Sequence, residues 1–336
     1  MQIMPKHREK QGQTTLSQGA HNSARKPTRS LRRVDRAVCR CFSPRPGNLS
    51  ALLLAALLIP FALAQNFADM NIEKVAKGFQ FTEGPAWSRE GFLLFSDCNA
   101  NKLYKFIGGT GTSDYADVPG GPNGNTYDVQ GRLYTCEFHS RRVTRTSKKG
   151  GVEVLASKFE GKRLNAPNDI TVRRDGHIYF TDPAFGDQQD TRELDFFGVY
   201  HITPKGELEA IARWKTRPNG ITLSPNGKTL YVADSDARVV RAFDLDKSGA
   251  ASKERVVIEN IPGVPDGIRT DEKGNIYVAA KHVFVYSEDA KLIGHIELSE
   301  TPSNLTFGDV DLESLFITAR TFVYRVRLGV KGALQY

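Results

Sequence analysis

The fold is decided by one recurring phrase, of which one copy is Gly176-His177-Ile178-Tyr179-Phe180-Thr181-Asp182, a turn glycine followed by a short apolar strand. The phrase returns at residues 91, 131, 227 and 274, and in a looser form at residue 312. Successive glycines are separated by 40, 45, 51 and 47 residues, and the looser copy follows after 38. Six repeated units therefore fit between residues 65 and 336.

Several copies of the phrase are followed by a polar turn and another alternating strand, as at residues 102–106, 142–146 and 239–243. Period-two alternation, with frequent Gly, Asn and Asp turns, indicates all-β structure. Repeats of 40 to 50 residues with about four strands each are typical of propeller blades. We predict an all-β fold, a six-bladed β-propeller over residues 65–336. The ring should close by pairing a first strand near 72–81 with residues 322–326, since closure removes free sheet edges.

The positive charge of the chain is concentrated at its amino-terminal end. Lys and Arg number 46 against 38 Asp and Glu, a net charge of +8, yet residues 1–48 carry +9 and residues 65–336 carry −1. This asymmetry excludes a uniformly basic domain that coats nucleic acid, and we expect no nucleic-acid partner. Binding through the basic leader alone is the alternative. Hydrophobic residues make up 40% of the chain, enough to form a core and to exclude global disorder.

Two leader segments are expected before the propeller. Residues 1–48 are rich in Arg, Ser, Gln and Pro, and we expect a disordered basic leader. Residues 49–64 form an apolar run that ends in Ala62-Leu63-Ala64, as in a signal peptide with its cleavage site. The run from 51 to 64 would rise about 21 Å as a helix, short of the roughly 30 Å hydrocarbon core. We expect export to the periplasm or medium after cleavage near Ala64. An uncleaved membrane anchor is the alternative, and a start site within residues 1–48 would shorten the leader.

A residue with a side-chain oxygen stands eight positions before each copy of the phrase. These residues are Glu83, Asn123, Asn168, Asn219, Asp266 and Asn304. A constant offset means an equivalent position in every blade, at the start of the innermost strand. We therefore expect the six oxygens to surround one mouth of the central channel. Turn formation would explain a single Asn-Gly or Asp-Gly pair, but it does not explain Glu83.

The chemistry of this set favours a metal ion. Two carboxylates and several amide oxygens, without His or Cys, suit a hard divalent cation better than a thiolate or imidazole zinc site. We expect one such cation with about four protein ligands. Ca²⁺ is the first candidate, and Mg²⁺, Mn²⁺ and Zn²⁺ are the others.

Other reactive side chains are assigned more modest roles. Acidic residues at the ends of the repeated strands, such as Asp97 and Asp182, are expected to cap the turns that follow them. His139 is a candidate substrate contact, although an isolated surface histidine is usually solvated. Cys98 and Cys136 fall on different blades and are expected to be packed thiols, with a disulfide as the alternative.

The chain resembles the SMP-30/gluconolactonase family of six-bladed propellers, which includes regucalcin. The resemblance covers about residues 70 to 330. It rests on the phrases Glu83-Gly84-Pro85-Ala86-Trp87, Asn165-Ala166-Pro167-Asn168-Asp169, Tyr179-Phe180-Thr181-Asp182-Pro183, Pro218-Asn219-Gly220-Ile221, Pro265-Asp266-Gly267-Ile268 and Asn304-Leu305-Thr306-Phe307-Gly308. The resemblance implies a divalent ion held by Glu83, Asn168, Asn219 and Asp266, a sugar lactone as substrate and Asp266 as the base. Ala166 stands where vertebrate members carry a substrate-clamping arginine, so that clamp is not carried over.

These features predict a lactonase of the gluconolactonase type, a monomer or weak oligomer without stable membrane association after cleavage. The cation would polarise the lactone carbonyl, and Asp266 would take a proton from the attacking water. Hydroxide at the cation is the alternative nucleophile, because a dication lowers the pKa of a bound carboxylate. Asn123, Asn304 and His139 would contact the substrate. A metal-dependent aryl-ester or phosphotriester hydrolase and a non-catalytic ligand-binding propeller are the competing functions.

Overall fold

The computed structural model describes residue 67 and residues 70–334. The expected basic leader (1–48) and signal segment (49–64) lie outside the described residues. In the part of the chain that is described, no helix has the length and apolar character needed to cross a membrane. A short 3-10 helix, η2 (Gly186–Gln188), lies in the connection between β13 (Ile178–Asp182) and β14 (Phe197–Ile202).

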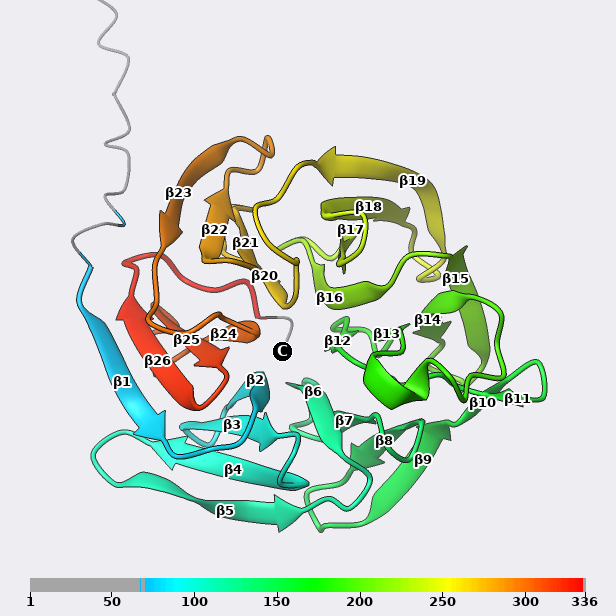
Figure 1. Cartoon of the computed structure of the whole chain (residues 1–336), viewed down its shortest axis with the longest axis horizontal. Helices are drawn as coiled ribbons and strands as arrows, with labels where there is room; N and C mark the ends of the chain where they lie inside the picture. The colour runs from blue at the N-terminus through cyan, green and yellow to red at the C-terminus, as the bar shows by residue number, and fades with distance from the viewer. Residues whose placement is uncertain (1–66, 68–69, 335–336) are drawn as a thin grey trace, which may run out of the picture. The chain divides into compact units, whose positions relative to one another are not determined.

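Six antiparallel sheets of four strands each surround a central channel, as predicted (Figure 1). Each sheet is one blade, and its first-named strand here is the innermost one. Blade 1 contains β2 (Thr82–Ser88), β3 (Phe92–Asp97), β4 (Lys102–Ile107) and β5 (Gly111–Asp117), and blade 2 contains β6 (Pro122–Tyr127), β7 (Leu133–Glu137), β8 (Arg142–Thr146) and β9 (Val152–Ala156). Blade 3 contains β12 (Ile170–Val172), β13, β14 and β15 (Leu208–Trp214), and blade 4 contains β16 (Pro218–Leu223), β17 (Thr229–Asp234), β18 (Val239–Leu245) and β19 (Ala251–Ile258). Blade 5 contains β20 (Ile268–Thr270), β21 (Ile276–Ala279), β22 (Val283–Tyr286) and β23 (Leu292–Ile296).

Blade 6 closes the ring with strands from both ends of the domain. It contains β24 (Asn304–Gly308), β25 (Ser314–Ala319), β26 (Phe322–Arg327) and β1 (Ile72–Lys77). Strand β1 pairs antiparallel with β26, with Ala76 opposite Val323. The predicted closure is confirmed, although the first strand ends at Lys77 instead of continuing to residue 81. A small hairpin of β10 (Lys158–Phe159) and β11 (Lys162–Arg163) lies outside the blades.

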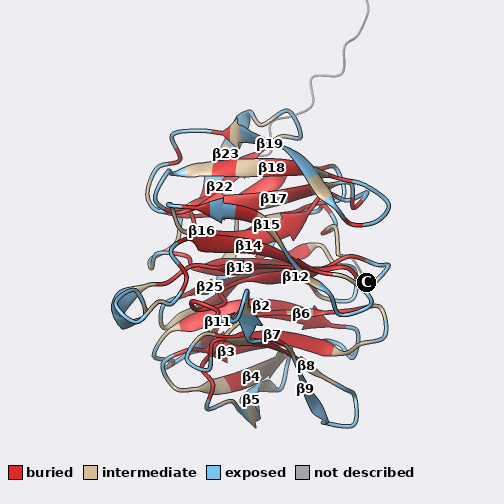
Figure 2. Ribbon diagram, turned by 90° about the vertical axis from the view of Figure 1, so that its right-hand side faces the viewer, coloured by how far each residue is buried: buried red, intermediate tan, exposed pale blue. Residues whose placement is uncertain are grey.

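Burial decreases from the channel to the rim of each blade (Figure 2). Every residue of β3, β13 and β25 is buried, whereas most of β5 and β19 is exposed or half-buried. The second strand of each blade has neighbouring blades on both faces, so most of its residues are buried. Aromatic rings pack between blades, as in the stack of Trp87 on Phe316 at 5.6 Å between ring centroids.

The two cysteines of the propeller are buried free thiols, as predicted. Cys98 follows β3 in blade 1 and Cys136 lies in β7 of blade 2. Burial raises the pKa of both thiols well above 9.0. Both side chains therefore act as small apolar groups in the described structure.

Candidate active site

Five of the six predicted side chains line one cavity of about 330 Å³ where the innermost strands begin. They are Glu83, Asn123, Asn168, Asn219 and Asp266. Glu83, Asn123 and Asn219 lie in the first two residues of their strands, and the other two stand two residues before β12 and β20. Five of the residues at the constant sequence offset therefore meet in one cavity.

Glycine next to the site residues allows the innermost strands of neighbouring blades to approach closely. A Cβ atom at Gly220 would lie 2.3 Å from the carbonyl oxygen of Asp266, and one at Gly84 would lie 1.9 Å from that of Asn123. The backbone N–H of Gly220 instead donates to the Asp266 carbonyl at 3.0 Å. The Asn-Gly pairs are therefore elements of inter-blade contact within or beside strands, and not simple turns. This contact fixes the spacing of the side chains around the channel.

Glu83 is buried and receives two hydrogen bonds on Oε2. The donors are the backbone N–H of Gly84 at 2.9 Å and the side-chain amide of Asn304 at 3.2 Å. Burial raises the pKa of Glu83 from 4.5 to about 7, and the negative charge of Asp169 adds to this, while the two hydrogen bonds lower it. Glu83 can therefore hold a proton near neutral pH when no cation is close to it.

The pKa of Asp266 is raised by burial and by nearby negative charge, as that of Glu83 is. Burial raises the pKa of its carboxyl group well above 3.8, and the charges of Glu83 and Asp169 raise it further. A hydrogen bond from Asn219 lowers it. Two carboxyl groups that repel each other in a buried cavity are a favourable environment for a divalent cation, because the cation would allow both to ionise.

Two of the amide oxygens in the site lack hydrogen-bond donors among the described residues. Asn219 Oδ1 and Asn123 Oδ1 are buried, and neither has a hydrogen-bond partner among the described residues. The Nδ2 group of Asn219 donates to Ser235 Oγ at 3.2 Å, and Ser235 Oγ donates to the Pro265 carbonyl at 2.7 Å. Buried acceptors without donors are costly unless a ligand supplies a positive charge or a donor.

This donor-poor set of oxygens fits a hard divalent cation. No Lys or Arg is among the described residues that line the cavity. Across residues 67 and 70–334, no cluster of three or more His, Cys, Asp and Glu side chains is arranged to hold a metal. A cation in this cavity would therefore depend on amide oxygens of Asn168 and Asn219 as well as the carboxylates of Glu83 and Asp266.

Asn304 and His139 lie outside the lining of the cavity. Asn304 is buried behind Glu83, to which it donates, and its Oδ1 accepts from the backbone N–H of Leu305 at 2.8 Å. Its position makes it a residue that orients Glu83. His139 is exposed, with Nδ1 3.3 Å from Asn101 Oδ1. Its ring packs against Phe138, and it is Phe138 that lines the cavity.

The constant offset does not identify the residues that form the walls of the cavity. These residues are Phe81, Cys98, Asn99, Phe138, Ala166, Phe185 and Gln188. Most of them stand just before an innermost strand or just after the second strand of blades 1 to 3. Their place beside the acidic ends of β3, β7 and β13 is a signal that could have identified them, but the side chains differ from blade to blade.

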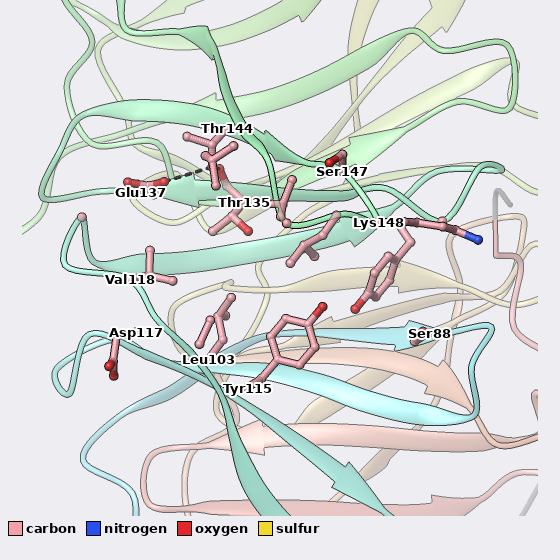
Figure 3. Close-up of a pocket in the computed structure, with 18 of the residues that line it drawn as sticks. Ser88, Leu103, Tyr115, Asp117, Val118, Thr135, Glu137, Thr144, Ser147 and Lys148 are labelled. Carbon is pink, nitrogen blue, oxygen red and sulfur yellow. Dashed lines mark hydrogen bonds between the residues drawn. The ribbon is translucent and has the colours of Figure 1, made fainter.

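A larger cavity of about 540 Å³ lies between blades 1 and 2 (Figure 3). Leu103, Tyr115 and Thr135 contribute to its lining, and Glu137 is held there by Thr144 Oγ1 at 3.0 Å. None of the six residues at the constant offset lines this cavity. The smaller cavity, where the predicted residues meet, is therefore the candidate active site.

Comparisons with known proteins bear on the family of the chain. Residues 81–321 match the family described as the SMP-30/Gluconolactonase/LRE-like region. The chain is 31% identical to a gluconolactonase of Zymomonas mobilis over 294 residues, which covers 78% of this chain and 82% of that protein. It is 24% identical to a pentonolactonase of Haloferax volcanii, covering 70% and 80% of the two chains. A solved gluconolactonase from Xanthomonas campestris is 33% identical and superposes with a TM-score of 0.73, covering 80% of this chain and 92% of that one.

Proposed function

The chain belongs to the SMP-30/gluconolactonase family and is a lactonase, and we propose that it hydrolyses lactones in the cavity at the mouth of the channel. We further propose that Glu83, Asn168, Asn219 and Asp266 hold one divalent cation there, with Ca²⁺ as the first candidate. The names of the relatives support the reaction. The arrangement of the cavity supports the residues and the cation.

One observation carries this proposal. The floor of the cavity, formed by Glu83, Asn123, Asn168, Asn219 and Asp266, holds two buried side-chain oxygens without donors, Asn123 Oδ1 and Asn219 Oδ1, beside two crowded carboxyl groups. A cation would satisfy the unpaired oxygens and the two carboxylates together. A purely structural channel would leave these groups at a cost in stability.

The proposed reaction adds water across the ester bond of the lactone. The bound cation supplies Lewis-acid polarisation of the carbonyl group. Asp266 takes a proton from the water whose oxygen attacks the carbonyl carbon. The bond between that carbon and the ring oxygen then breaks, and Asp266 returns the proton to the ring oxygen. The product is an open-chain hydroxy acid, and the Oδ1 atom of Asn123 is placed to accept a hydrogen bond from the water or the substrate.

The test combines metal analysis with kinetics on the purified protein. We expect one divalent ion per chain, loss of lactone opening on chelation and recovery on addition of Ca²⁺, Mg²⁺ or Mn²⁺. Asp266→Asn should lower kcat by about 100-fold or more and weaken cation binding in calorimetry. The matched control is Asp289→Asn, an exposed acid between β22 and β23 that does not line the cavity. Full activity of Asp266→Asn, or activity and metal content unaffected by chelation, would overturn the proposal. Faster turnover of paraoxon or aryl esters than of any lactone would favour the competing hydrolases.

We also propose that the protein is exported and loses residues 1–64. The apolar run at 49–64 and the Ala62-Leu63-Ala64 sequence support this. Amino-terminal sequencing of the protein from the medium or periplasm should begin at Gln65. A membrane-bound chain that retains residues 49–64 would instead indicate an uncleaved anchor.

A further inference from the structure

The walls of the candidate active site differ in character from its floor. Three phenylalanines, Phe81, Phe138 and Phe185, line the cavity from blades 1, 2 and 3. All three are half-buried, so each leaves part of its ring free to contact a ligand. Asn99 and Gln188 are the polar side chains that accompany them in the walls. The carboxyl and amide oxygens are thus gathered on the floor of the cavity, with a mainly apolar wall beside them.

The position of Phe185 is fixed from the neighbouring blade. The guanidinium of Arg217 lies 4.6 Å from the centre of the Phe185 ring. Arg217 is itself held by Asp236, which accepts hydrogen bonds from its backbone N–H at 2.9 Å and from Nε at 3.0 Å. A cation over an aromatic face stabilises that ring position. Phe185 is therefore a supported part of the wall.

Phe138 and Phe81 are also held in place. The ring of Phe138 packs on His139 with 4.0 Å between ring centroids, and a Cβ atom at Gly121 would lie 2.8 Å from the Phe138 ring. The backbone N–H of Phe81 donates to Asp97 Oδ1 at 3.0 Å. The rings of Phe185 and Phe138 are packed against neighbours and the backbone of Phe81 is anchored, so the wall is largely preorganised and little conformational entropy is lost when a ligand binds.

From these contacts we propose that the cavity selects neutral lactones with an apolar aryl or alkyl substituent over lactones hydroxylated on most ring carbons. This inference rests on the proposed function. The lactone group would lie on the oxygen-rich floor, and the substituent would pack on the three phenylalanines. A heavily hydroxylated ring would place hydroxyl groups against the same rings, where few partners replace the water they lose. The described lining offers no Lys or Arg to a phosphate or carboxylate group.

The first experiment compares three δ-lactones of one ring size. These are δ-valerolactone, δ-nonalactone with its butyl substituent, and D-glucono-δ-lactone. We expect kcat/KM for δ-nonalactone to exceed that for δ-valerolactone about tenfold or more, mainly through a lower KM. The value for gluconolactone should be lower than that for δ-nonalactone. A gluconolactone value above that of δ-nonalactone, or no gain from the butyl group, would overturn the inference.

The second experiment tests the walls by substitution. Phe185→Ala should reduce the preference for δ-nonalactone over δ-valerolactone to about twofold, mainly through a higher KM for δ-nonalactone, with cation affinity unchanged. Phe185→Leu should retain most of the preference, because it keeps an apolar side chain. Tyr115→Ala, in the other cavity, is the matched control and should leave the preference intact. A preference unaffected by Phe185→Ala would contradict a role for this wall.

A binding measurement separates this inference from the proposed function. Lactams resist hydrolysis, so calorimetry can compare 2-piperidone with 6-butyl-2-piperidone whether or not the protein turns over a lactone. A preference for the butyl lactam without any lactone hydrolysis would refute the proposed reaction and support the apolar wall. Turnover of δ-valerolactone with equal affinity for both lactams would support the proposed reaction and refute the apolar wall.

Discussion

Asn219 and Glu83 are each oriented by a partner that does not itself line the cavity. Ser235 accepts from Asn219 and donates to the carbonyl group just before Asp266, and Asn304 donates to Glu83. Partners of this kind fix which atom of an amide or carboxylate points at a ligand. The constant offset in the sequence identifies the side chains of the site. It does not identify Ser235, because that contact depends on how blades 4 and 5 pack.

Removing the hydroxyl group of Ser235 should weaken cation binding. In Ser235→Ala the side-chain amide of Asn219 loses an acceptor and the Pro265 carbonyl loses a donor. Changes to such supporting residues typically cost about 10- to 100-fold in metal affinity. Calorimetric titration with Ca²⁺ measures this effect. Ser252→Ala, an exposed serine on β19, should leave the affinity unchanged, and equal affinities in both variants would refute the role given to Ser235.

A buried histidine pair in blade 3 should make stability depend on pH. His177 Nδ1 lies 2.7 Å from His201 Nε2. Burial lowers the pKa of both below 6.5, and the proximity of His177 lowers that of His201 further. The unfolded chain therefore binds more protons than the folded one once the pH falls below about 6.5. The contribution of the pair to the free energy of unfolding should fall from there, by at most about 1.4 kcal/mol per pH unit for each histidine.

Denaturant unfolding of the parent protein and of His201→Gln at pH 7.5, 6.5 and 5.5 tests this dependence. The variant lacks one titrating ring, so its stability should fall less between pH 6.5 and 5.5. Other buried groups titrate in this range, and the comparison with the parent removes their contribution. His139→Gln, at an exposed position, should follow the parent. Parallel curves for parent and His201→Gln would exclude the pair as a source of the pH dependence.

At the scale of strands, the acidic residues at the ends of the second strands connect the fold to the site. We predicted that they cap the turns that follow, and Asp97 does accept from the backbone N–H of Ala100 at 3.4 Å. Its shorter hydrogen bonds come from Gln80 and Phe81, at 2.8 and 3.0 Å, in the segment that leads into the innermost strand. Asp182 receives the backbone N–H groups of Asn165 and Ala166 in the same way, both at 2.8 Å. The sequence could not separate these two roles, because both place an acid after a strand.

Replacing Asp97 should therefore weaken the entry to β2 as well as its turn. In Asp97→Ala the backbone N–H groups of Gln80 and Phe81 lose their acceptors. An unsatisfied buried donor costs about 1 to 3 kcal/mol, and these two hydrogen bonds are part-buried, so the free energy of unfolding should fall by about 1 to 2 kcal/mol. Asp114→Ala removes an exposed salt bridge with Lys102 and should lower the free energy of unfolding much less. Chemical denaturation measures both, and equal losses would show that Asp97 has no special structural role.

At the scale of the domain, the repeat predicted the blade number, the strand closure and the meeting of the site residues. It could do so because the strands of every blade pack in the same way, so equivalent positions have similar surroundings. The exceptions arise where blades differ. Asn304 has the same offset as Asn219, yet it is turned to Glu83 across the junction of blades 6 and 1. The three phenylalanines lie in connecting segments whose residues do not repeat, so no periodic signal marks them.

The four proposed cation ligands come from four blades, which predicts that the cation stabilises the whole ring. Glu83 lies in blade 1, and Asn168, Asn219 and Asp266 precede or open the innermost strands of blades 3, 4 and 5. An ion bound only by the folded protein adds about 2.7 kcal/mol to the free energy of unfolding at a concentration a hundred times its Kd. Unfolding in Ca²⁺ and in chelator should differ by about this amount in the parent protein. The difference should vanish in Asp266→Asn and persist in Asp289→Asn. Identical unfolding midpoints of the parent protein with and without the cation would contradict a shared site, because four blades that meet at one bound ion cannot separate without releasing it.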